Sequence, residues 1–234
     1  MAEAIDYKHI GSRPVRPDGV DKVTGRAEFG GDVSLPGMII GKILRSPHAH
    51  ARIKSIDITD ALAIPGVHAV ITGEDFPGGG ISGEIDGEGG GSISDQAKNV
   101  IARDKVLYHG HALAAVAAIS DRAADRALDA IKVEYEVLSP VLDILEAIDP
   151  DSVLVNENNY TKLPEKPDRP SNIANVGNLV RGDIQEGFDR ADVVIEREYV
   201  CPMTHQGYIE PHSCLASVDE EGKGTVWCST QGHF

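Results

Sequence analysis

The stretch that decides the fold is residues 112–137, which read ALAAVAAISDRAADRALDAIKVEYEV. Its first eight residues form a continuous run of small apolar side chains, which is typical of a buried strand. Ser120 or Asp121 can then cap a helix, and residues 132–137 have the composition of a further strand. The stretch therefore predicts a β-α-β unit in an α+β or α/β domain.

The helix predicted within this stretch has two different faces. Residues three or four positions apart lie on the same side of a helix, and one side here is apolar: Ala123, Ala124, Ala127, Leu128 and Ile131. The opposite side carries charges of alternating sign, which favours exposure to water. Because most of the apolar side chains are alanines, we expect the helix to approach its sheet closely.

Further strands are predicted upstream, at residues 38–45, 52–58 and 67–72. The second alternates apolar and polar side chains, as a half-buried strand does. A helical turn at 61–64 follows it and ends at Pro65-Gly66. The first 36 residues are rich in turn signals, with one short strand expected at 27–29.

The segment 73–99 contains two triple-glycine runs, at 78–80 and 89–91, with acidic residues between them. Glycine-rich loops can cradle phosphate, but such a loop needs a strand before it, a helix after it and usually a lysine. Acidic flanks would instead repel an anion. A flexible surface insertion is the favoured interpretation.

The C-terminal part begins with a short helix at 140–149, followed by a proline- and asparagine-rich linker. Beyond it we expect a helical turn at 183–188, a strand at 192–200, and a hairpin of strands 213–219 and 225–229. The last strand leads into Ser229-Thr230-Gln231-Gly232. Small polar residues and a glycine at a strand end are typical of a ligand site.

Composition and charge limit the classes of function. Apolar residues at 41% and charged residues at 25% are ordinary for a globular protein. The formal charge of −15 disfavours nucleic acid and anionic membrane surfaces, which bind basic proteins. No apolar run is long enough to span a bilayer.

The cysteines and the N-terminus favour a cytoplasmic protein. Cys201, Cys214 and Cys228 contain no CxxC spacing, so no zinc knuckle or iron–sulfur site is indicated. Each lies in or beside an apolar strand pattern, where a buried free thiol is expected. The first residues, MAEAIDYKHIG, lack the cationic flank and apolar core of a signal peptide.

Two histidine pairs, His48/His50 and His109/His111, have a spacing of two. On a strand this spacing places both rings on one face, as in some metal sites. Neither pair has a third ligand nearby, so structural histidines are favoured over zinc or copper binding. Glu210 is a candidate for partial burial, but one carboxylate without a partner is weak evidence for acid–base catalysis.

A series of short motifs resembles the large subunits of molybdenum hydroxylases, the xanthine dehydrogenase, aldehyde oxidoreductase and carbon monoxide dehydrogenase family. The resemblance covers nearly the whole chain. In chain order the main motifs are RPDGVDKVTGRA at 16–27, LPGM at 35–38, RSPHAHARI at 45–53, TGEDFP at 72–77, GDI at 182–184, ADVV at 191–194 and IEP at 209–211.

This resemblance implies an α+β fold, with an α/β-hammerhead domain followed by the beginning of a molybdopterin-binding domain. The implied boundaries are an N-terminal arm at 1–17, the hammerhead at 18–148 with its insertion at 73–99, a linker at 149–176, and the incomplete second domain at 177–234.

The resemblance further implies an oxidoreductase that hydroxylates aldehyde or heteroaromatic carbon with water as the oxygen source. Its cofactor would be molybdopterin, with Gln231 contacting the molybdenum oxo group and Gly232 letting the backbone approach the pterin. No protein side chain would ligate the metal. Iron–sulfur clusters and FAD would lie on partner subunits, and the rest of the molybdenum subunit, or a second chain of it, would complete the site.

Two departures from the family pattern stand out. Residues 109–113 read HGHAL where the family usually has a glycine, a polar or acidic residue, proline and valine. The family's catalytic glutamate and most pterin loops would lie beyond residue 234, so no catalytic residue is assigned and the chain alone is expected to be inactive. A non-enzymatic hammerhead scaffold or interaction subunit without cofactor is the alternative.

Overall fold

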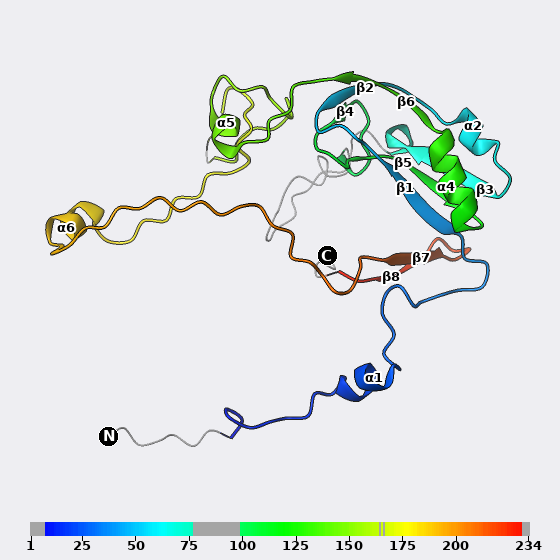
Figure 1. Ribbon diagram of the computed structural model, residues 1–234, viewed down its shortest axis with the longest axis horizontal. Helices are drawn as coiled ribbons and strands as arrows, with labels where there is room; N and C mark the ends of the chain where they lie inside the picture. Colours follow the sequence, from blue (N-terminus) through cyan, green and yellow to red (C-terminus); the bar gives the residue numbers. More distant parts are fainter. Residues whose placement is uncertain (1–7, 77–98, 164, 166, 231–234) are drawn as a thin grey trace. The chain divides into compact units, whose positions relative to one another are not determined.

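The structure is a computed structural model that describes residues 8–76, 99–163, 165 and 167–230 (Figure 1). The chain divides into two compact units. The larger comprises residues 38–194 and the smaller comprises residues 1–37 together with 195–234. Within the described residues, the larger unit holds two three-stranded sheets and the smaller holds one two-stranded sheet.

The first sheet of the larger unit has the strand order β1-β5-β3. Its central strand, β5 (Ala112–Ala118), pairs antiparallel with β1 (Ile40–Arg45) and with β3 (Val67–Thr72). The apolar run that opens the deciding stretch is therefore the middle strand of a sheet. A strand in that place is covered on both faces, which explains why its sequence does not alternate.

The second sheet has the order β4-β2-β6. Its central strand β2 (Ala51–Asp57) pairs antiparallel with β4 (Lys105–Val106) and β6 (Lys132–Val137). The helix α4 (Asp121–Ala130) thus connects β5 to a strand of the other sheet. The strand, helix and strand predicted from the sequence are all present, but the two strands do not lie in one sheet.

Helix α4 packs against the first sheet through the predicted apolar face (Figure 1). The Ser120 hydroxyl accepts a hydrogen bond from the amide of Ala123 at 3.3 Å, so the predicted cap is confirmed. Ala124 and Ala127 are fully buried against Val116 and Ala118 of β5. Small side chains on both surfaces let the helix lie close to the sheet.

The opposite side of β5 belongs to a second core, formed with the other sheet. Leu113 is fully buried there with Ala51, Ala102 and Val106. Burial of one leucine side chain stabilises the fold by roughly 1.5–3 kcal/mol. The second core therefore fixes how the two sheets pack.

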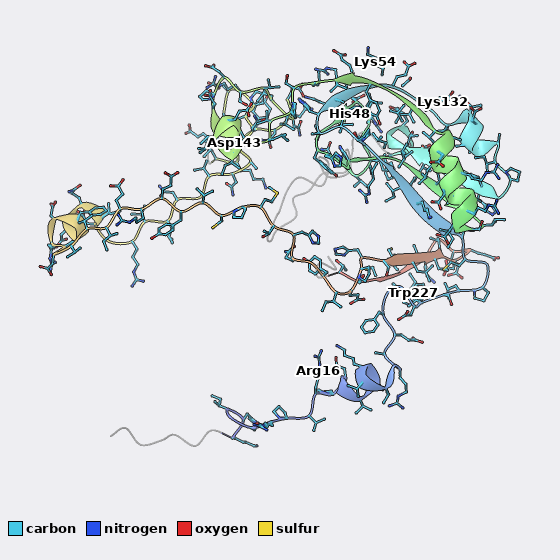
Figure 2. The ribbon with its side chains drawn as sticks, viewed as in Figure 1. Arg16, His48, Lys54, Lys132, Asp143 and Trp227 are labelled. Atoms are coloured by element: carbon cyan, nitrogen blue, oxygen red, sulfur yellow. The ribbon has the colours of Figure 1, made fainter. Side chains whose placement is uncertain are left out.

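Short helices and turns complete this part of the larger unit. α2 (Thr59–Leu62) precedes β3, and Gly66 between them has φ +91°. The ammonium of Lys132 on β6 lies 2.6 Å from a carboxylate oxygen of Asp60 on α2 (Figure 2 labels Lys132). This ion pair attaches α2 to the second sheet.

The base of the glycine-rich insertion is described from both ends. The 3-10 helix η1 (Gly73–Asp75) leads into it and has a capping box in which Thr72 and Asp75 exchange hydrogen bonds with the backbone. The guanidinium of Arg103 donates to the carbonyl oxygens of Gly73, at 2.8 Å, and Phe76. Most of the predicted insertion, residues 77–98, lies outside the described residues.

Residues 144–176 carry more local structure than their composition suggests. Asp143, labelled in Figure 2, caps α5 (Ile144–Ile148) by accepting two backbone hydrogen bonds. Further along, the Asn159 side chain donates to the carbonyl oxygen of Ser171 at 2.7 Å, and Lys162 forms a parallel bridge with Asn175. α6 (Ile184–Asp189), capped by Asp183, follows.

The smaller unit consists of α1 (Gly19–Thr24) and the hairpin of β7 (Cys214–Val218) and β8 (Gly224–Cys228). The predicted hairpin is present, but the strands expected at 27–29 and 192–200 are absent. A segment with the composition of a strand becomes one only where another strand pairs with it, and no described residue pairs with either segment. Ile195 is consequently 74% exposed.

The expected burial of the cysteines is also wrong: Cys201, Cys214 and Cys228 are all free and exposed. Cys214 and Cys228 lie on a face of the two-stranded hairpin that no described element covers. Among the described residues no helix has the length and apolar character needed to cross a membrane.

Candidate functional site

A cavity of about 630 Å³ lies in the smaller unit, where β8 ends. It is formed by three segments that are distant in sequence. Its lining consists of Glu28, Phe29, Gly30, Tyr208, Ile209, Glu210, His212, Cys228, Ser229 and Thr230. A second hollow of about 320 Å³ shares part of this lining. Figure 2 labels Trp227 on the adjoining strand.

The turn at Phe29–Asp32 brings the N-terminal segment to this place. The amide of Phe29 donates to the Asp32 carboxylate at 3.0 Å, and the amide of Asp32 donates to the carbonyl oxygen of Phe29 at 2.9 Å. The next amide, of Gly30, donates to Glu210 Oε1 at 3.4 Å. The turn therefore points a backbone N–H toward the segment before β7.

A glycine is required at position 30 because the hairpin residues Ser213 and Ser229 lie directly against its backbone. A Cβ at this position would lie 2.7 Å from Ser213 Oγ and 3.3 Å from the amide nitrogen of Ser229. Both distances are shorter than ordinary contacts, so a larger residue would move the turn away from the hairpin. Sequence patterns alone did not assign Glu28, Phe29 or Gly30 to a site; the Gly30-Gly31 pair before Asp32 was the available signal.

Ser229 fixes the open end of the hairpin. Its hydroxyl accepts the amide hydrogen of Ser213 at 3.1 Å and donates to the carbonyl oxygen of Pro211 at 3.2 Å. Its own amide donates to the carbonyl oxygen of Ser213 at 3.3 Å. One side chain thus aligns the segment entering β7 with the segment leaving β8.

The lining combines apolar and polar side chains and carries negative charge. Glu28 and Glu210 are carboxylates, and none of the described lining residues is a lysine or arginine. The rings of Tyr208 and His212 lie edge to face, with centroids 5.3 Å apart. This surface suits an uncharged ring that exchanges hydrogen bonds, whereas a phosphate would need cationic groups from elsewhere.

One buried hydroxyl supports the same interpretation. Ser213 Oγ is buried and has no hydrogen-bond partner among the described residues, and Ser213 lines the smaller hollow. A buried polar atom without a partner costs free energy unless a ligand or another chain satisfies it. Gln231 and Gly232, the predicted cofactor residues, lie outside the described residues; Thr230, which directly precedes them, lines the cavity.

Glu210 is exposed rather than partly buried, and its contact with Gly30 is the interaction described above. The histidine pairs are not strand residues: His48 and His50 lie in the irregular segment between β1 and β2, and Gly110 between the other two forms a turn with φ +85°. The spacing of two therefore does not place either pair on one face. Among the described residues, no cluster of three or more histidine, cysteine or acidic side chains could hold a metal ion.

Three of these four histidines, His48, His50 and His111, have separate surroundings. His48 packs edge to face on Tyr135 at 4.8 Å between centroids, and His50 Nδ1 lies 2.7 Å from the carbonyl oxygen of Ser139. His111 is fully buried, with Nε2 lying 2.7 Å from the carbonyl oxygen of Asn99. Burial lowers the pKa of His111. The described contacts of these side chains support the predicted structural role.

Two family models match this sequence. Residues 24–139 match "Aldehyde oxidase and xanthine dehydrogenase, a/b hammerhead domain". Residues 165–234 match "Molybdopterin cofactor-binding domain". The chain belongs to the xanthine dehydrogenase and aldehyde oxidase family. The predicted fold class, a hammerhead domain followed by the beginning of a molybdopterin-binding domain, is confirmed.

The chain aligns along nearly its whole length with curated members of this family, but it covers only part of each of them. It is 34% identical over 97% of its length to the nicotinate dehydrogenase large molybdopterin subunit of Eubacterium barkeri, and covers 48% of that protein. It is 31% identical over 95% of its length to the carbon monoxide dehydrogenase large chain of Afipia carboxidovorans, and covers 27% of that protein. The chain thus spans from about a quarter to about half of these family members.

Solved structures of the family agree with the fold. The Cu,Mo-CO dehydrogenase superimposes with a TM-score of 0.70 at 30% identity, over 93% of this chain and 27% of that one. Quinoline 2-oxidoreductase from Pseudomonas putida 86 gives a TM-score of 0.72 at 27% identity, over 94% of this chain and 27% of the other.

Proposed function

We propose that this chain is the N-terminal portion of the molybdenum-cofactor subunit of an oxidoreductase that hydroxylates aldehyde or heteroaromatic carbon with water as the oxygen source. The observation that carries the proposal is the match of residues 165–234 to the molybdopterin cofactor-binding domain. The matched region includes seven of the ten residues that line the cavity, at 208–210, 212 and 228–230. Because the chain spans 27–48% of the two relatives described above, the remaining part of the site would come from residues outside these 234.

Gln231 and Gly232 would hold the cofactor in this chain. When bound, the cofactor supplies a molybdenum centre that accepts two electrons from the substrate carbon. The Gln231 amide would donate a hydrogen bond without adding charge, and Gly232 would leave space for a close backbone approach. The described lining is compatible with the pterin ring and lacks cationic groups for its phosphate, so the phosphate contacts are assigned to the remaining part of the subunit.

The partners in this proposal are the remainder of the molybdenum subunit, or a second chain of it, and an iron–sulfur subunit, with an FAD subunit as the further electron carrier. The described residues offer no three-residue cysteine or histidine cluster for a metal, so electrons would leave through another polypeptide. A cytoplasmic location is part of the proposal, and the three free thiols support it.

The test is to purify the native assembly that contains this chain, and to measure molybdenum by mass spectrometry and pterin by its fluorescence after oxidation. We expect molybdenum in stoichiometric amount. Gln231→Ala should lower turnover by about 100-fold, the size typical of losing one hydrogen-bond donor at a reacting centre. Gln185→Ala on the exposed helix α6 is the matched control and should leave turnover unchanged.

Complexes that contain the chain but never molybdenum would contradict the enzymatic proposal. Full activity in the Gln231→Ala assembly would contradict the role of that residue. If the chain were still required for assembly in either case, it would act as a scaffold subunit. The domain boundaries at 148/149 and 176/177 remain part of the proposal, and limited proteolysis of the assembly would test them.

A further inference from the structure

Two cysteines of the smaller unit face each other across the hairpin. In the antiparallel register, Cys214 of β7 is the direct partner of Cys228 of β8. Side chains of directly opposite residues project from the same face of a sheet. Both residues are exposed and both thiols are free. The two thiols therefore lie opposite each other on adjacent strands, on an accessible face of the described chain.

Hydrogen bonds on either side define the type of this pair. The Ser229 amide donates to the carbonyl oxygen of Ser213, and the Asp219 amide donates to the carbonyl oxygen of Lys223. Hydrogen-bonded and non-hydrogen-bonded pairs alternate along an antiparallel ladder. Ser213/Ser229 and Asp219/Lys223 are therefore hydrogen-bonded pairs, at opposite ends of the hairpin. The alternation from either of them makes Cys214/Cys228 a non-hydrogen-bonded pair.

That type of pair has the right spacing for a disulfide. The Cα atoms of a non-hydrogen-bonded pair are typically about 4.5 Å apart, and the side chains approach more closely than in the other type. Disulfides span Cα separations of about 4.4–6.8 Å. A bridge between these cysteines therefore requires rotation of the two thiols with little backbone movement.

Both ends of the hairpin are fixed, which holds the two cysteines in register. At the open end, Ser229 Oγ joins the segments before β7 and after β8. At the turn, Asp219 Oδ1 accepts the amide hydrogens of Glu221 and Lys223, and Gly222 takes the left-handed conformation with φ +81°. A slip by one residue would break both sets of contacts.

We propose that Cys214 and Cys228 form a reversible redox site that closes as an intramolecular cross-strand disulfide. The site takes low-molecular-weight disulfides such as oxidised glutathione as its oxidant. The proposal does not depend on the function proposed above or on a bound cofactor. Because Cys228 also lines the cavity at the end of β8, the bridge would form at the cavity wall.

The exchange proceeds in two balanced steps. The thiolate of one cysteine attacks a sulfur of the small disulfide, forming a mixed disulfide and releasing one small thiol. The thiolate of the second cysteine then attacks the protein sulfur of this mixed disulfide. The attack forms the Cys214–Cys228 bond and releases the second small thiol. Two electrons pass from the protein dithiol to the reagent, and the two protons end on the released thiols.

The experiment treats the full 234-residue chain with oxidised glutathione, alkylates the remaining thiols, and maps peptides by mass spectrometry. We expect the peptides of Cys214 and Cys228 to be joined, while Cys201 is alkylated or carries glutathione. Dithiothreitol should reverse the bond. Because the reaction is intramolecular, the bridged fraction should be the same at low and high protein concentration.

Three variants distinguish this bridge from general thiol reactivity. Cys214→Ser and Cys228→Ser should each stop at a glutathione adduct on the remaining cysteine of the pair. Cys201→Ser removes the third thiol and should bridge as the wild type does. The proposal would be overturned if the wild type kept glutathione on both Cys214 and Cys228, or if neither cysteine reacted. A bridge that involves Cys201, or disulfides formed only between molecules, would also overturn it.

Discussion

The ammonium of Lys105 lies 2.8 Å from Glu157 Oε1, and its side chain is only 10% exposed. This ion pair joins β4 of the second sheet to the segment that follows α5. Arg52 of β2 contacts the same carboxylate oxygen at 3.4 Å. Two strands of the second sheet thus hold the segment 150–176 through one glutamate.

Replacement of Glu157 by glutamine should remove this attachment. Burial opposes ionisation of Glu157, but hydrogen bonding and charge from Lys105 and Arg52 outweigh it, so its pKa lies below the usual value. A lowered pKa contributes stability above the unfolded pKa of about 4.3, and this is lost as pH falls through the folded pKa. Glu157→Gln should lower the free energy of unfolding by about 0.5–1 kcal/mol at pH 7. The stability of the variant should also fall less than that of the wild type as the pH is lowered.

Urea unfolding between pH 3 and pH 7 measures both effects. Glu186→Gln is the matched control, because the Glu186–Arg190 pair is exposed on both sides. Equal acid sensitivity of the wild type and Glu157→Gln would rule out the attachment.

His111 should make the larger unit sensitive to mild acid. Its ring accepts the amide hydrogen of Leu107 at Nδ1, so that Nε2 carries the proton donated to Asn99. Burial lowers its pKa, so the folded state resists protonation. The sign follows from linkage: stability is complete above the unfolded pKa of about 6.5 and falls as the pH drops below it.

Substitution of His111 by alanine should remove this dependence and destabilise the unit by about 3 kcal/mol, because it leaves a cavity and removes the hydrogen bonds of the ring with Leu107 and Asn99. Thermal unfolding at pH 5 and pH 7.5 provides the measurement. The exposed His109→Ala is the control and should behave as the wild type. A pH response that survives in His111→Ala would assign the effect to another group.

Gly66 is required by both conformation and space. It has φ +91°, and a Cβ would lie 2.8 Å from Cγ1 of Ile119. Gly66→Ala should therefore lower the free energy of unfolding by about 1–3 kcal/mol. Gly41→Ala in β1, where a Cβ meets no atom within 4 Å, should have little effect. Parallel urea titrations of both variants provide the comparison, and equal midpoints would refute the prediction.

The contact between α4 and its sheet leaves no space for larger side chains. Ala127 is fully buried against the first sheet. Ala127→Leu should destabilise the unit by about 1–3 kcal/mol through overpacking, whereas Arg126→Leu on the exposed side of α4 should change stability by less than about 0.5 kcal/mol. Calorimetry of the two variants tests this, and an unchanged melting temperature for Ala127→Leu would argue against close packing.

Local patterns predicted the elements whose partners are close in sequence. The 3.6-residue spacing from Ala123 to Ile131 gave the buried face of α4, and Ser120 gave its cap, because both are properties of one helix. The strand prediction at 192–200 failed because the composition of one segment does not show whether another strand will pair with it. Without a pairing strand among the described residues, that segment has no regular secondary structure.

Of the three segments that form the candidate site, the sequence predicted only the one that follows β8. The polar residues after β8 identified the region, but the contributions of Glu28, Phe29 and Gly30 depend on a contact between residues nearly two hundred positions apart. The position of Gly30 beside Ser213 cannot be read from local sequence, because a glycine pair before an aspartate fits many loops.

The sequence by itself determined the family, the capped alanine-faced helix and the hairpin, because motif order, periodicity and turn residues are encoded over short distances. Only the tertiary structure decided that β5 and β6 enter different sheets, that Lys105 meets Glu157, and that Cys214 faces Cys228. The sheet order and the cysteine pair depend on strand pairing and register, where a shift of one residue turns every side chain to the other face. The ion pair depends on where the segment after α5 folds back on the second sheet, and no local pattern specifies either.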